Sequence, residues 1–356
     1  MNFEFPEDCT AIAAELRRVL AKACPMDEVR RCLDQRRPSS TAWLALADLG
    51  VLGATVPERW GGSGLTPLQL SACAEEIGRA CAPVPTLAST YLATEALLMG
   101  GSDALREQWL PGLAQGKVVG SVALTAGKLR WSAGKVTGRL ERVPAGAAAA
   151  FVITACDGVL LCIDLATPAV TQRELRVLDP GAPLADIDLD GVAAAVLGDA
   201  QSLDTLIDRA AAFLAFEQLG GADRALEMAR DHAMQRRTFG RVVASYQAIK
   251  HKLADMWVMN ELARGHAYHA AWALAHSPPS LPLAAAGARV AASAAFELAS
   301  HENLQVHGGV GYTWEADCHP FYKRSLSTSL ALGAPQFWKR RIVKCLAAAR
   351  GDHDGL

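Results

Sequence analysis

Residues 235–257 read Gln-Arg-Arg-Thr-Phe-Gly-Arg-Val-Val-Ala-Ser-Tyr-Gln-Ala-Ile-Lys-His-Lys-Leu-Ala-Asp-Met-Trp, and this stretch separates two long helical patterns. Before it, apolar residues recur at helical spacing from about Leu206 to Met234. After it, we expect a helix from about Ser245 whose buried face carries Tyr246, Ile249, Leu253, Met256 and Trp257. The stretch therefore predicts two long helices joined by a turn.

The predicted turn contains Arg236, Thr238, Phe239 and Gly240. An arginine offers a planar fork for phosphate, a threonine adds a hydroxyl donor, and a phenylalanine adds a flat apolar face. Such a turn is suited to hold a planar anionic ligand. The alternative is a solvated turn whose Phe239 is packed into the core.

A second glycine-rich stretch follows the next long helical pattern. It reads Gln-Val-His-Gly-Gly-Val-Gly-Tyr over residues 305–312, and its glycines permit close approach of the backbone. Arg-x-Thr-Phe-Gly, then Tyr-Gln-Ala-x-x-x-x-Leu-Ala-Asp-Met, then Gln-x-His-Gly-Gly-x-Gly-Tyr, in this order, resembles the C-terminal half of the acyl-CoA dehydrogenase family.

Composition excludes several other classes of protein. The 356 residues are 51% hydrophobic with a formal net charge of −2, which predicts neither a nucleic-acid-binding nor a membrane-binding surface. We find no run of about 20 apolar residues and no signal peptide. The nine cysteines lack a Cys-x-x-Cys pair, which indicates reduced thiols and no structural metal site. We therefore expect a cytoplasmic protein without a metal.

The periodicity changes twice along the chain. Residues 1–115 show helical spacing, residues 116–200 show short β-like runs separated by glycines, and residues 201–356 are again helical. The order is similar to that of the acyl-CoA dehydrogenases along the whole chain. We therefore predict an α+β fold with an N-terminal helical domain, a central β domain and a C-terminal four-helix bundle.

The resemblance implies a cofactor, a reaction and a set of contacts. Members of the family bind FAD and oxidise the Cα–Cβ bond of an acyl-CoA thioester, with a carboxylate as base, and an electron-accepting flavoprotein is the expected partner. In the family the residues of the arginine turn reach the FAD of a neighbouring subunit near its pyrophosphate. The positions implied as cofactor contacts are Arg236, Thr238, Phe239, Gln247, Gln305, Gly308 and Gly309.

The positions expected for the catalytic base hold apolar residues. The commonest family position, counted from Gly308, is occupied by Leu332, and the second position, on the helix before the turn, is occupied by Ala210. Asp208 and Glu217 lie nearby in the sequence and could serve as a displaced base. The alternative is that Asp208 is solvated near a helix start and that Glu217 is ion-paired within the bundle.

The flavin-binding segment of the β domain also departs from the family pattern. Leu124-Thr125 is followed by Ala-Gly-Lys over residues 126–128, where the family usually has Glu-Pro and then Gly-Ser-Asp. We find no equivalent of the family's Trp-Ile-Thr strand between Val136 and Thr154. The motifs that reach a neighbour's FAD are kept, whereas those for the chain's own flavin ring and base are altered.

Two hypotheses follow from this combination. In the first, the chain is a catalytic FAD-dependent acyl-CoA dehydrogenase with a displaced base. In the second, it is a non-catalytic partner subunit that completes FAD sites with a paralogous chain, as in heteromeric family members that act on bulky acyl-CoAs such as steroid side chains. Both predict assembly through the C-terminal helices, as a homo-oligomer or as a heterotetramer.

Overall fold

The computed structural model describes residues 5–125 and 127–351, with side chains described up to residue 349. Helices flank a central run of strands, so the predicted α+β fold class is confirmed. The chain forms two compact units. The first contains the chain up to residue 30, residues 71–82 and the chain from residue 211, and the second contains residues 31–70 and 83–210.

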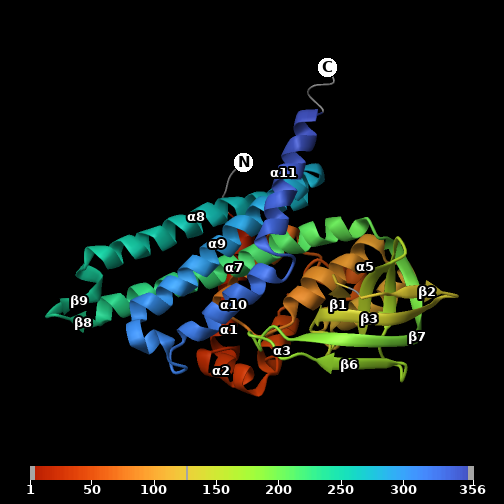
Figure 1. Ribbon diagram of the computed structural model, residues 1–356, viewed down its shortest axis with the longest axis horizontal. Coiled ribbons are helices and arrows are strands. Elements are labelled where there is room, and N and C mark those ends of the chain that lie inside the picture. The colour runs from red at the N-terminus through yellow and green to blue at the C-terminus, as the bar shows by residue number, and fades with distance from the viewer. Residues whose placement is uncertain (1–4, 126, 352–356) are drawn as a thin grey trace. The chain divides into compact units, whose positions relative to one another are not determined.

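The first unit is helical. Its elements are α1 (Glu7–Ala23), most of α4 (Pro67–Arg79), the greater part of α7 (Ser202–Gln235), α8 (Gln247–His276), α9 (Leu281–His307), α10 (Cys318–Leu330) and α11 (Pro335–Gly351). Helix α2 (Met26–Gln35) begins in this unit. Figure 1 shows α7, α8 and α9 running alongside one another, with a small hairpin joining α7 to α8.

Small residues allow the helices of this unit to pack closely. Helix α9 is rich in alanine, which favours helix, and it packs against α8, α10 and α11. Helix α4 approaches α7 at Gly78 and Gly220. A Cβ atom on Gly78 would lie 1.7 Å from the Glu217 carbonyl oxygen, and one on Gly220 would lie 1.8 Å from that of Glu75. Only glycine permits this approach of the two backbones.

Two details of the predicted helices are corrected. The segment after α7 is a β-hairpin, followed by the short helix η3 (Val243–Ser245), rather than a simple helix–helix turn. Trp257 is 58% exposed and does not belong to the buried face of α8. That face carries Met256, Asn260 and Ala263, so Trp257 lies one residue, about 100°, away from it.

The second unit combines short helices with a sheet. Its helical elements are α3 (Ser40–Asp48), η1 (Glu58–Trp60), the π-helix η2 (Leu87–Thr94), α5 (Glu95–Gly100) and α6 (Asp103–Ala114). Its strands are β1 (Gly120–Ala123), β2 (Arg130–Ser132), β3 (Lys135–Pro144), β4 (Phe151–Cys156), β5 (Val159–Asp164), β6 (Val170–Glu174) and β7 (Leu184–Asp199). The sequence did not predict the π-helix.

The sheet follows the order β1-β4-β5-β7-β3-β2, with β6 paired to β7. The β1–β4 pair is parallel and the other pairs are antiparallel. The long strand β7 pairs with β3 and β6 along its first part and with β5 along its last part. Buried side chains such as Val136, Leu161 and Ile187 form one core within this sheet.

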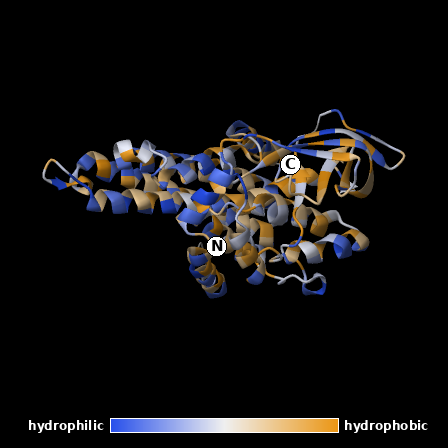
Figure 2. Cartoon of the chain, turned by 90° about the horizontal axis from the view of Figure 1, so that it is seen from below, coloured by the Kyte–Doolittle hydropathy of each residue, from blue (hydrophilic) through white to orange (hydrophobic). Residues whose placement is uncertain are grey.

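The apolar character of α9 reflects packing within the chain. Among the described residues, the segment Pro278–Tyr312 is long and apolar enough to cross a membrane by length and composition alone. However, 56% of its most apolar window is buried inside the fold, as in the core helix of a globular protein. Figure 2 shows polar and apolar residues mixed along the helices of this unit, and both kinds at the hairpin.

Candidate functional site at the end of the helical bundle

The arginine-containing stretch forms a tight β-hairpin. Strand β8 (Arg237–Thr238) pairs with β9 (Arg241–Val242), and Phe239 and Gly240 form the turn. Both turn residues have positive φ, 51° for Phe239 and 80° for Gly240, as a two-residue hairpin turn of type I′ requires. Glycine adopts this region freely, whereas for a phenylalanine it costs on the order of 1 kcal/mol.

Contacts at its base hold the hairpin. The Tyr246 hydroxyl donates to the Thr238 carbonyl over 2.9 Å, and the Val243 amide donates to the Arg236 carbonyl over 2.8 Å. The Arg241 guanidinium lies 4.2 Å from the centre of the Tyr246 ring, within cation–π distance. The hairpin is therefore fixed by its own backbone and by Tyr246.

The side chains at the tip of the hairpin face solvent. Phe239 is 97% exposed and Arg236 is also exposed, while Thr238 is half-buried. The alternative in which Phe239 packs into the core is therefore wrong. A strained and almost fully exposed phenylalanine has no role in the packing of this chain, so the tip is suited to contact another molecule.

The glycine-rich stretch begins where α9 ends. Gly308 and Gly309 open the short helix η5 (Gly308–Tyr312), and Gly308 has a φ of 64°. Apart from the adjacent chain, no atom of the described residues lies within 4 Å of a Cβ built on either glycine. The exposed Gln305 donates from Nε2 to the Tyr312 hydroxyl. The exposed Gln247 lies at the start of α8, with its Nε2 3.1 Å from His251 Nε2.

The structure brings the two motifs to one end of the helical unit. The rings of His232, near the end of α7, and His307, at the end of α9, stack with 4.1 Å between their centres. Beside them, Val306 belongs to the same apolar cluster as Ala233 and Val243. Burial, followed by the neighbouring His307 and Arg236, lowers the pKa of His232 below 6.5.

Sequence reasoning missed several residues of this site. His232 stacks on His307, Tyr246 donates to the Thr238 carbonyl, and Arg241 lies over the Tyr246 ring, although none of the three was singled out as a contact. The Phe-Gly dipeptide between two short β-prone runs was the available signal for a hairpin. The stacking of the two histidines has no local signal, because it joins residues 75 positions apart in the sequence.

The positions expected for a catalytic base are buried. Leu332 is 2% exposed and Ala210 is fully buried. Asp208 is 1% exposed, so the alternative of a solvated Asp208 is wrong. Glu217 is buried and its Oε1 lies 3.9 Å from Arg324 Nη1, as expected for an ion pair within the bundle.

The altered flavin-binding segment lies along β3. The Gly127 amide donates to the Arg139 carbonyl over 2.9 Å, and the Glu141 amide donates to the Thr125 carbonyl over 3.2 Å. Thr125 is exposed and Leu124 is half-buried, while Ala126 lies outside the described residues. The segment therefore uses its backbone to extend the pairing of β3, without supplying a carboxylate.

The end of the helical unit fits one side of a planar anionic group. Arg236 supplies a guanidinium fork, Gln247 and Gln305 supply amides, and the open space around Gly308 and Gly309 leaves the backbone accessible. All these groups are on the surface, so a ligand held by them would be covered on one side only, and we call this set the candidate half-site. Nowhere in residues 5–125 and 127–351 do three His, Cys, Asp or Glu side chains gather as a metal site would require.

Comparison with known proteins identifies the class to which this fold and half-site belong. The models of the acyl-CoA dehydrogenase N-terminal and C-terminal domains match residues 6–117 and 201–346. The acyl-CoA dehydrogenase IpdE2 of Mycobacterium tuberculosis is 30% identical over 347 residues, covering 95% of this chain and 96% of that protein. These matches define a protein of the acyl-CoA dehydrogenase class.

Solved structures agree along the whole chain. A Tcur3481–Tcur3483 steroid ACAD variant is 25% identical with a TM-score of 0.89, covering 98% of this chain and 100% of that one. The ChsE4–ChsE5 complex of Mycobacterium tuberculosis is 26% identical with a TM-score of 0.89, covering 98% of this chain and 99% of that one. The chain belongs to the acyl-CoA dehydrogenase family of oxidoreductases, as the sequence motifs predicted.

Proposed function

We propose that the chain is a subunit of an FAD-dependent acyl-CoA dehydrogenase, and that its hairpin completes a flavin site formed with a neighbouring subunit. The observation that carries this proposal is the exposed tip of the hairpin. Phe239 is 97% exposed beside an exposed Arg236, so these groups have a binding role only when another chain and its cofactor cover them.

The residues of the half-site have distinct roles in this proposal. Arg236 binds a phosphate oxygen of the cofactor, Thr238 adds a donor, and Phe239 covers an apolar face. Gln247, Gln305, Gly308 and Gly309 hold the dinucleotide through amide and backbone groups. When bound, FAD supplies the hydride acceptor for oxidation of the acyl-CoA Cα–Cβ bond.

The buried apolar residues at the base positions favour the role of a partner subunit. Leu332 and Ala210 cannot accept a proton, and both are closed to solvent. In this role a paralogous chain supplies the carboxylate, and the two chains form a heterotetramer. The heteromeric names of the ChsE4–ChsE5 and Tcur3481–Tcur3483 structures support this arrangement, and the second name supports a bulky steroid acyl-CoA as substrate.

A catalytic role with a displaced base is the second candidate, because Asp208 is buried. Its carboxylate lies two residues from Ala210 on α7 and is 1% exposed, which is the setting of a proton-transfer group in a water-poor site. Glu217 is less suited, because Arg324 lies close to its carboxylate. Under this candidate the chain acts as a homo-oligomer.

Both candidates share an assembly, a location and an electron acceptor. The subunits pack through the C-terminal helices as a dimer or tetramer in the cytoplasm, and a separate electron-accepting flavoprotein reoxidises the reduced cofactor. Light scattering tests the assembly. A stable monomer that binds FAD in a closed site of its own would contradict the half-site.

The deciding experiment is expression of the chain alone and together with a paralogue encoded beside it. Flavin absorbance and dye reduction are then measured with acyl-CoAs of increasing bulk, including a steroid side-chain CoA. Activity only in the co-expressed complex supports the partner role. Activity of the lone chain that is lost in Asp208→Asn supports the displaced base, and the absence of flavin from every preparation contradicts the proposal.

A further inference from the structure

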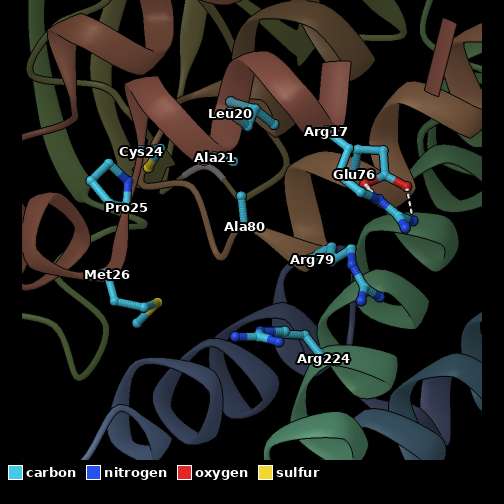
Figure 3. Close-up of a pocket in the computed structure, with 10 residues that line it drawn as sticks. All are labelled: Arg17, Leu20, Ala21, Cys24, Pro25, Met26, Glu76, Arg79, Ala80 and Arg224. Carbon is cyan, nitrogen blue, oxygen red and sulfur yellow. Dashed lines mark hydrogen bonds and ion pairs between the residues drawn. The ribbon is translucent and has the colours of Figure 1, made fainter. Parts of the chain in front are cut away.

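A small cavity lies in the helical unit, lined by residues outside the hairpin site. It has a volume of about 230 Å³ and opens among α1, α4, α7 and the turn before α2. Figure 3 shows three arginines around it, Arg17, Arg79 and Arg224, with Leu20, Cys24 and Met26 among its apolar lining. No part of the proposed function uses this cavity.

The charges of the lining are unequally paired. Arg17 donates from Nε and Nη2 to the two carboxylate oxygens of Glu76, each over 2.7 Å. Arg17 and Glu76 therefore neutralise each other. Arg79 and Arg224 share the single carboxylate of Glu227. Asp223, next to Arg224 in the chain, lines a different groove, where it accepts from Asn260 and Arg264. Glu227 lines that other groove as well, so the three arginines of this cavity face only the carboxylate of Glu76, which Arg17 already occupies, among the lining residues.

Arg224 is the group most available to a ligand. Its one polar contact within the described chain is the 3.3 Å hydrogen bond from Nη1 to Glu227, and its side chain is 40% exposed. A guanidinium carries five N–H donors in a planar fork that matches a carboxylate. Most of the donors of Arg224 are therefore open to an anion, next to a second cation at Arg79.

The apolar lining and the volume of the cavity indicate the polarity and the length of the rest of the ligand. Leu20 and Cys24 are 1% and 4% exposed, so the apolar surface open to a ligand comes from the exposed Ala21 and Pro25 and the half-buried Met26. These three side chains carry no charge and suit a hydrocarbon tail rather than a second anionic group. The volume lies below the roughly 300–1,000 Å³ of pockets for drug-sized ligands, which limits the tail to a few carbons. We propose that this cavity binds a small amphipathic carboxylate, with its head at Arg224 and Arg79 and its tail against Ala21, Pro25 and Met26.

Calorimetric titration of the full chain with hexanoate tests the proposal, with acetate, hexylamine and inorganic phosphate as comparison probes. Arg224→Gln removes the head contact, and Ala21→Phe fills the cavity from an exposed position of its lining without changing a charge. Arg18→Gln is the matched control, because Arg18 is an exposed arginine on α1 that pairs with Glu15 and does not line the cavity. Circular dichroism confirms that each variant is folded.

We expect hexanoate to bind with one-to-one stoichiometry and more tightly than acetate, and hexylamine not to bind. Arg224→Gln should weaken hexanoate binding about ten- to a hundredfold, as the loss of a hydrogen bond to a charged group predicts. Ala21→Phe should abolish binding, and Arg18→Gln should leave it unchanged. Equal affinity for acetate and hexanoate, binding of phosphate alone, or loss of binding in Arg18→Gln would overturn the proposal.

Discussion

Polar side chains in the interior of the helical bundle and side chains at its hairpin end differ in their exposure to solvent. In the interior, Arg289 is fully buried and donates to Gln218 Oε1 and to the Thr328 carbonyl, and burial lowers the pKa of its guanidinium to about 9. At the hairpin end, Arg236 and Phe239 are exposed. The guanidinium of Arg289 is paired mainly within the chain, although its Nε has no partner among the described residues, whereas the side chains of Arg236 and Phe239 face solvent.

This contrast separates two kinds of evidence for function. A buried polar group costs free energy unless its hydrogen bonds are made, so the Arg289–Gln218–Thr328 contacts are explained by folding. An exposed aromatic residue with positive φ adds nothing to folding, so Phe239 requires a different explanation. The following predictions test whether the two regions differ as proposed, beginning with the largest expected effect.

The largest effect concerns turnover by the lone chain. Without a carboxylate at Leu332 or Ala210, general-base assistance is lost, and acyl-CoA oxidation should fall by about 10²–10⁴ relative to a complex that carries the base. Leu332→Glu should not restore it, because the flavin segment near Thr125 also lacks its usual carboxylate. Dye reduction measured with and without the paralogue checks this, and fast turnover by the unpaired chain would remove the partner role.

The next effect concerns the interior. Gln218→Leu removes the acceptor of Arg289 Nη1 and the donors to Ser293 and Thr328, and should lower the free energy of unfolding by about 1.5–3 kcal/mol. Urea denaturation measures it. Gln305→Leu is the same chemical change at the exposed end and should alter stability by less than about 0.5 kcal/mol. If both variants lose the same free energy of unfolding, the proposed difference between the interior and the hairpin end is wrong.

The third prediction concerns the hairpin end, where we expect a substitution to change cofactor binding and not stability. Arg236→Ala should weaken FAD retention about ten- to a hundredfold while leaving stability nearly unchanged, because the lost bond is to a phosphate rather than to the chain. Flavin fluorescence after dilution of the assembled protein measures it. Arg237→Ala is the control. If Arg237→Ala releases FAD and Arg236→Ala does not, the contacts are shifted by one residue.

The smallest effect concerns His232, which lies in the last turn of α7 and stacks on His307. Burial first, then His307 and Arg236, hold the pKa of His232 in the folded chain below the 6.5 of the unfolded chain. The unfolded chain therefore binds more protons below about pH 6.5, so stability should fall as the pH falls through this window. We expect a change of about 0.5 kcal/mol or less, because solvent screens a half-buried group. Thermal melts at about pH 7.5 and 5.5 should differ less for His232→Gln than for the wild type.

The sequence by itself determined the α+β class, the family and the residues of the two motifs. Helical and β periodicities are local properties of the chain, and the Arg-x-Thr-Phe-Gly and Gln-x-His-Gly-Gly patterns are specific in combination. The division at residues 116 and 201 and the seven cofactor contacts remain predictions. The absence of a carboxylate at Leu332 is likewise visible in the sequence.

Only the tertiary structure decided where these residues lie. Periodicity placed Trp257 inside, yet the buried face of α8 is set by Met256 and Asn260, which pack against the neighbouring helices. Phe239 is exposed and Asp208 is buried, because burial depends on segments far away in the sequence. The stacking of His232 on His307 and the shared carboxylate of Arg79 and Arg224 also join distant residues. The Arg224–Glu227 pair is an i,i+3 pair that the sequence spacing allows, but the histidine stack and the Arg79–Glu227 pair arise from helix packing, and no local pattern of residues encodes them.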